Sequence, residues 1–95
     1  MLVLPETVTV REAREVLQMF EASIAQEASD PLTVDASALK DFDSAALALL
    51  LECARQAKVY RRGFAVRGAP AKLTELAMLY GVDELLDIPH PPAAA

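Results

Sequence analysis

The chain has very few of the residues on which most enzyme sites depend. Its 95 residues include one cysteine, one histidine and three glycines. His90 lies in a proline-rich stretch that would not hold it in a catalytic geometry, and Cys53 has no histidine partner in an ordered segment. The glycines are too dispersed to form a phosphate-binding loop. We therefore expect no enzymatic activity and no catalytic residues.

Metal ligands and positive charge are also scarce. One cysteine and one histidine cannot supply a zinc site. Asp35, Asp41 and Asp43 are close in sequence, but acidic residues in a loop before a helix are more often caps and solvated charges than Mg²⁺ ligands. Nine basic against fourteen acidic residues give a net charge of −5, which disfavours a nucleic-acid partner. We expect no metal, no cofactor and no nucleic acid.

Long apolar runs are absent. The longest uninterrupted run, residues 45–51, is far shorter than the ~20 residues that span a bilayer, and residues 1–6 lack the pattern of a signal peptide. We expect a cytoplasmic protein with no direct membrane insertion. The length suits a single domain, which we place at residues 1–88, followed by a mobile Pro/Ala tail at 89–95.

The chain does contain a regular alternation of short apolar runs and helical patterns. The runs predict strands at 2–4, 32–34 and 64–66, and the patterns predict helices at about 10–27, 44–60 and 70–80. Thr9 and Glu12 match the capping box that opens a helix, and Asp43 or Ser44 caps the second helix. Strands joined by helical crossovers should be mostly parallel, so the order predicts an α/β layer fold.

The ends of these elements carry further signals. Pro70 suits the first position of the third helix, Gly81 suits its end, and residues 85–86 should tuck back onto the core. The first helix has one apolar stripe and one polar face. A basic cluster of Lys58 and residues 61–62 follows the second helix; we interpret it as favourable charge at a helix C-terminus, with contact to an acidic partner as the alternative.

The second helix has apolar residues around most of its circumference. At 100° per residue, the expected core face holds Leu47, Leu50, Leu51, Ala54 and Lys58. The opposite face has too little charge for a solvated surface. It is covered either by another layer of the same domain or by a partner protein, and we favour the partner. The residues of this second face, with those at the helix start and flank, are Asp43, Ser44, Ala45, Ala48, Leu49, Glu52, Cys53, Gln56 and Tyr60.

Two stretches resemble a known family. Residues 34–37 (VDAS), followed by residues 42–50 (FDSAALALL), resemble the strand and loop-to-helix motif of the STAS domain, named after sulfate transporters and anti-sigma-factor antagonists. Residues 71–82 (AKLTELAMLYGV) resemble its MlaB-like branch, a subunit of the bacterial Mla phospholipid-transport ABC complex. The resemblance implies a STAS-like mixed sheet of a few short strands packed with helices. Since residues 2–4 resemble the second strand of the family, the first edge strand is expected to be missing.

The resemblance also implies a function in protein binding. In anti-sigma-factor antagonists the second residue after the motif aspartate is a phosphorylated hydroxyl residue; here it is Ala45, which cannot accept phosphate. The first hydroxyl position is kept as Ser44, where MlaB-like members contact the ATPase. Ala46 stands in place of the usual glycine.

We therefore expect a non-catalytic regulatory subunit that docks its second and third helices on the ATPase of a phospholipid-transport ABC complex. It would reach the inner membrane only through that partner. Two alternatives stay open at this point. One is an anti-sigma-factor antagonist in a partner-switching circuit. The other is a homo-oligomeric structural module, for which the open sheet edge would allow a homodimer.

Overall fold

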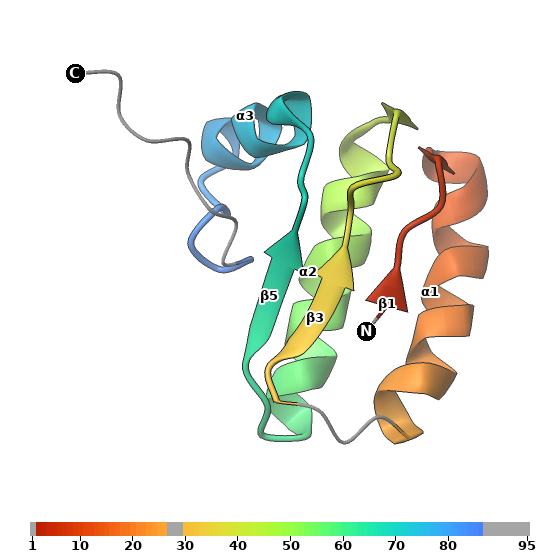
Figure 1. Ribbon diagram of the computed structural model, residues 1–95, viewed down its shortest axis with the longest axis vertical. Helices are drawn as coiled ribbons and strands as arrows, with labels where there is room; N and C mark the ends of the chain where they lie inside the picture. The colour runs from red at the N-terminus through yellow and green to blue at the C-terminus, as the bar shows by residue number, and fades with distance from the viewer. Residues whose placement is uncertain (1, 27–29, 87–95) are drawn as a thin grey trace.

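The computed structural model describes residues 2–26 and 30–86, and Figure 1 shows the arrangement of their helices and strands. The predicted alternation of strands and helices is confirmed, and two short strands are added to it. The elements in chain order are β1 (Leu2–Val3), β2 (Thr7–Val8), α1 (Val10–Gln26), β3 (Leu32–Asp35), β4 (Asp41–Phe42), α2 (Ser44–Val59), β5 (Phe64–Arg67) and α3 (Ala71–Leu79).

The main sheet has the strand order β1-β3-β5, and both of its ladders are parallel. Leu2, Val34 and Val66 form one row across the three strands. Successive right-handed crossovers in one direction place their helices on the same face of a sheet. In Figure 1, α2 passes behind the strands and α1 stands beside it, next to β1. The predicted α/β class is confirmed; no antiparallel pair occurs within the described residues.

The two faces of this sheet have different surroundings. Leu32, Val34 and Val66 point toward the helices and are buried. Val3 and Arg67, on the other face, are exposed. Within residues 2–26 and 30–86 no element covers that other face, so the domain has one sheet layer and one main helix layer.

The two added strands join the starts of the helices. β2 and β4 pair in parallel, with Thr7 opposite Asp41 and Val8 opposite Phe42. Residues 41–42 therefore form a strand where none was predicted. Because β2 leads directly into α1 and β4 directly into α2, this pairing brings the N-termini of the two helices side by side.

The sequence signals at the N-terminus of α1 are borne out. The amide and hydroxyl of Thr9 both donate to Glu12 Oε1, at 2.9 and 2.6 Å. These two hydrogen bonds hold the pKa of Glu12 below its ordinary value, because they stabilise the carboxylate. The predicted apolar stripe faces the core: Val16, Phe20 and Ile24 are buried.

Two helices end in the same way. The amides of Arg61 and Arg62 donate to Lys58 and Ala57 carbonyls at the end of α2, and the amides of Gly81 and Val82 donate to Met78 and Ala77 at the end of α3. Both patterns are Schellman motifs, which need a left-handed residue just past the helix. Gly81 has φ 70° there, as predicted, and Arg61 has φ 58°.

Lys58 and Arg62 of the basic cluster both lie at helix ends, but at different helices. Lys58 lies in the last turn of α2, but Arg62 Nη1 donates to the carbonyl of Ile24, near the C-terminus of α1, at 3.0 Å. The Arg62 guanidinium also lies 5.6 Å from the centre of the Tyr60 ring. Arg62 therefore joins the ends of α1 and α2.

Three details at the C-terminal side differ from or extend the predictions. Pro70 is the N-cap of α3 and not its first helical residue. Leu86 is fully buried, whereas Leu85 is 68% exposed, so only one residue of the pair returns to the core.

The predicted mobile tail at 89–95 lies outside the described residues. No helix in the described part of the chain is both long and apolar enough to cross a membrane.

Candidate partner-binding site

A single carboxylate caps both main helices. Asp43 Oδ1 accepts a hydrogen bond from the amide of Ala45 at 2.8 Å, and this makes Asp43 the N-cap of α2. Its other oxygen, Oδ2, accepts from the amide of Val10, the first residue of α1, at 3.3 Å. The pairing of β2 with β4 makes this sharing possible. Asp43 therefore fixes where α2 begins relative to α1.

Ser44 is left available by this arrangement. It is the first residue of α2, it is exposed, and it is not the cap. Its hydroxyl makes no hydrogen bond within residues 2–26 and 30–86. A hydroxyl at the start of a helix, beside amides that lack intrahelical partners, is a polar group that a bound molecule can use.

Beside Ser44 the surface is hollowed between the start of α2 and α3. This α2/α3 hollow has a volume of about 590 Å³. Its apolar wall is unusually accessible, since Leu79 is 78% and Tyr80 58% exposed. The lining residues are Phe42, Asp43, Ser44, Lys72, Glu75, Leu76, Leu79 and Tyr80. An open hollow with apolar side chains and a few polar groups is suited to binding another molecule.

The predicted outer face of α2 is wrong for two residues. Leu49 is 3% exposed and Cys53 is fully buried, so neither lies on a free surface. The reason is that α1 packs alongside α2 and covers this side, while the sheet covers another. The buried arc is rotated by about a quarter turn from the predicted one, taking 100° per residue. The residues of that arc are Ala46, Leu47, Leu49, Leu50, Cys53 and Ala57.

The other predicted site residues are separated along α2. Ala48 is exposed and lies one turn after Ser44, while Ala45 is partly buried. Glu52 is engaged by Arg55, whose Nε donates to Oε2 at 2.9 Å, and this lowers the pKa of Glu52. Tyr60 is exposed at the far end of the helix, about 24 Å from Ser44 at 1.5 Å per residue. The structure therefore gathers only Asp43, Ser44 and Ala48 near the hollow.

The thiol of Cys53 is unreactive in this environment. Desolvation by burial, with smaller contributions from Glu52 and Glu21, raises the pKa of its thiol to about 12. A protonated, buried thiol is neither a nucleophile nor a metal ligand. In the described part of the chain, no three side chains of the metal-binding types gather closely enough to hold an ion.

Six of the eight residues that line the hollow were not predicted as site residues, although the third helix was expected to take part in docking. Phe42 belongs to β4. Lys72, Glu75, Leu76, Leu79 and Tyr80 all belong to α3 or its C-cap. One signal was present in the sequence: two large side chains, Leu79 and Tyr80, stand next to each other at the end of the predicted third helix. The sequence could not show that both would be exposed.

Comparison with known proteins gives one family. The model of the family described as "Mlab, STAS domain" matches residues 1–87, which is nearly the whole chain. No curated protein matches the sequence. The chain therefore belongs to the MlaB-like STAS domain family, as the two motifs suggested.

Proposed function

We propose that this STAS domain is an accessory subunit that binds the ATPase of a phospholipid-transport ABC complex through the α2/α3 hollow. Membership of a family of regulatory and binding domains supports the class of function. The observation that carries the proposal is the combination of exposed Leu79 and Tyr80 with the available hydroxyl of Ser44 at one hollow. In this role the domain works at the cytoplasmic side of the inner membrane and performs no catalysis of its own.

The hollow has the features of a protein contact. Leu79 and Tyr80 are large side chains that lose much accessible surface when a partner covers them, and such residues dominate binding energy at interfaces. Ser44 adds one polar contact, and its position is set by Asp43, which is anchored to α1 as well as α2. A partner that binds here meets a preformed surface and does not have to order it.

The test is a binding titration between the full chain and the purified cognate ATPase subunit. We expect Leu79→Asp to weaken binding by ~2 kcal/mol or more, because a charge would be forced into a desolvated contact. Ser44→Ala should weaken binding by ~1–3 kcal/mol, since a partner group would lose its hydrogen bond. Neither change should alter the fold, because both side chains are exposed.

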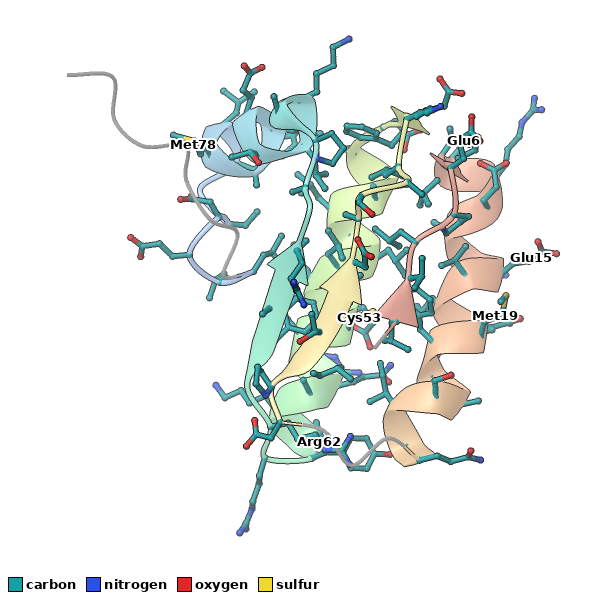
Figure 2. The ribbon with its side chains drawn as sticks, in the orientation of Figure 1. Glu6, Glu15, Met19, Cys53, Arg62 and Met78 are labelled. Atoms are coloured by element: carbon teal, nitrogen blue, oxygen red, sulfur yellow. The ribbon has the colours of Figure 1, made fainter. Side chains whose placement is uncertain are left out.

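A matched control is available on the other side of the domain. Met19 is 68% exposed on α1, and Figure 2 shows it far from Met78 and the α3 end. Met19→Asp introduces the same charge into an exposed apolar position and should leave the affinity unchanged. Equal affinities of all three variants and the wild type would contradict the proposal.

A phosphorylation assay distinguishes the proposed function from that of an anti-sigma-factor antagonist. That function requires a hydroxyl at position 45, and Ala45 has none. We expect no phosphate to be incorporated when the protein is incubated with ATP and an anti-sigma-factor kinase, as measured by intact-mass spectrometry. Stoichiometric phosphate on Ser44, which is exposed, would favour the antagonist instead.

A further inference from the structure

A second hollow lies farther along α2. Its volume is about 250 Å³, and it is lined by Leu51, Ala54, Arg55, Lys58 and Leu85. Leu85 is the residue of the 85–86 pair that does not return to the core and is 68% exposed. A leucine held at the surface against a half-buried leucine leaves apolar area that the domain itself does not cover.

The two hollows lie on the same side of α2. Ser44 in the first hollow and Leu51 and Lys58 in the second are spaced seven residues apart, which places them on one helix face. One chain segment also contributes to both hollows on their other side, with Tyr80 at the first and Leu85, five residues later, at the second. Along the axis of α2, Ser44 in the first hollow and Ala54 in the second are separated by about 15 Å.

This geometry fits an α-helix as the occupant. The exposed face of α2 between the hollows carries Ala48, a small residue that allows a second helix to approach closely. Residues at a seven-residue spacing are the pattern by which two helices pack along each other at a small angle. A helix that spans both hollows would present apolar side chains about seven to eleven positions apart, to match the 15 Å separation.

The charges at the second hollow indicate which side chains the partner helix should carry. The second hollow is lined by two basic side chains and no acidic one, on a protein whose net charge is −5. The charge of Arg55 is engaged by Glu52, but Lys58 has no ion pair within residues 2–26 and 30–86. An acidic side chain of a partner would complement Lys58.

We infer that the partner of this domain places a single amphipathic helix with an acidic flank along α2, with one apolar side chain in each hollow and a carboxylate facing Lys58. This inference rests on the proposed function, because it specifies how the ATPase subunit would use the α2/α3 hollow. It adds a second contact, from Leu51 to Lys58 together with Leu85, that the proposed function does not require.

The experiment uses site-specific photo-crosslinking in the full chain. A benzophenone amino acid replaces Leu79 in one variant and Leu85 in another, each is irradiated with the purified cognate ATPase subunit, and the crosslinked peptides are identified by mass spectrometry. We expect both variants to crosslink to one helix of the ATPase subunit, at positions about seven to eleven residues apart. That helix should carry Asp or Glu beside its apolar face.

A charge reversal provides an independent measurement. Lys58→Glu should weaken ATPase binding at least about fivefold, because like charges would face each other across the contact. Arg14→Glu is the matched control: Arg14 is exposed on α1 and lines neither hollow, so it makes the same change in net charge. We expect it to change the affinity less than about twofold. Thermal melting of both variants verifies that the fold is kept.

The outcomes separate the two proposals. Crosslinking from position 79 but not 85, or from the two positions to different segments of the partner, overturns the single-helix inference and leaves the proposed function standing. Equal effects of Lys58→Glu and Arg14→Glu also overturn it. Crosslinking from neither position, together with full binding by Leu79→Asp, overturns the proposed function and this inference with it.

Other occupants give distinct results. Crosslinking from position 85 between two copies of this chain, without the ATPase subunit, would assign the second hollow to self-association. Sedimentation with vesicles of anionic phosphatidylglycerol that is lost in Lys58→Glu, with ATPase binding unchanged, would assign it to a lipid surface. Either result contradicts the inference.

Discussion

The two faces of α2 are made from the same residue types but have opposite roles. The buried face contains Leu49, Leu50 and Ala57, and the exposed face contains Ala48 and the half-buried Leu51. What separates them is their neighbours: α1 and the sheet cover one face, whereas the other borders the two hollows. Apolar character alone therefore does not show which face of such a helix supports the fold and which is free to bind.

The most direct test of the difference between the two faces of α2 is to place the same charge on adjacent residues, one from each face. Leu49→Asp should destabilise the domain by about 4 kcal/mol or more, because it removes a buried leucine and leaves a carboxylate in the core. For a domain of this size such a loss removes a large share of the free energy of unfolding. Chemical denaturation followed by circular dichroism measures the effect.

Ala48→Asp is the control for that substitution. Ala48 is exposed and close to the N-terminus of α2, where a negative charge is tolerated, so the change in stability should stay within about 0.5 kcal/mol. If both variants were equally stable, the assignment of the two faces would be wrong.

A smaller effect is expected at the point where the two helices share a cap. Asp43→Ala should destabilise the domain by about 2 kcal/mol, at the upper end for a lost cap, because amides of both α1 and α2 lose an acceptor. Urea denaturation measures the loss. Asp43→Asn keeps a side-chain oxygen at the cap and should recover much of the stability. No difference between Asp43→Ala and the wild type would show that the shared carboxylate contributes nothing to the fold.

The burial of Cys53 predicts a pH dependence. The thiol ionises near 9.0 when unperturbed, whereas burial raises its pKa to about 12 in the folded protein. Between these values the unfolded state binds fewer protons than the folded state, so stability falls as pH rises, by up to about 1.4 kcal/mol per pH unit. Below pH 9 this contribution is fully present.

Other groups also titrate at high pH, so the measurement compares the wild type with Cys53→Ala. The alanine variant is less stable at neutral pH but should lack the thiol's share of the alkaline slope. Parallel pH profiles for the two proteins would mean that Cys53 is not desolvated. A labelling reagent at pH 8 should likewise react with the thiol only after unfolding.

The sequence predicted those parts of the fold that local patterns determine. The first helix could be predicted with its cap and its core face because Val16, Phe20 and Ile24 form one narrow stripe, and polar residues occupy the rest. Gly81 and Asp43 were identified because helix ends have strong residue preferences. These features depend on a few neighbouring residues and not on the packing of the whole domain.

The missed features depend on contacts between distant segments. The apolar residues of α2 cover so much of its surface that only the position of α1 decides which are buried. The β2–β4 pair joins two-residue strands that are 34 positions apart, too short to carry a periodic pattern. The third helix was expected at the docking surface, but its contributing residues were not identified, since the exposure of Leu79 and Tyr80 follows from how α3 lies against α2.

The left-handed turn at Arg61 has a consequence for engineering. At the equivalent position after α3 the chain has Gly81, which adopts this backbone freely, whereas Arg61 does so with a side chain. Arg61→Gly should therefore raise the free energy of unfolding by about 1 kcal/mol, because glycine adopts this backbone without the steric cost. Arg62 would retain its contact with α1, and neither hollow includes Arg61. A more robust version of this domain, with its recognition surface intact, can begin from this single position.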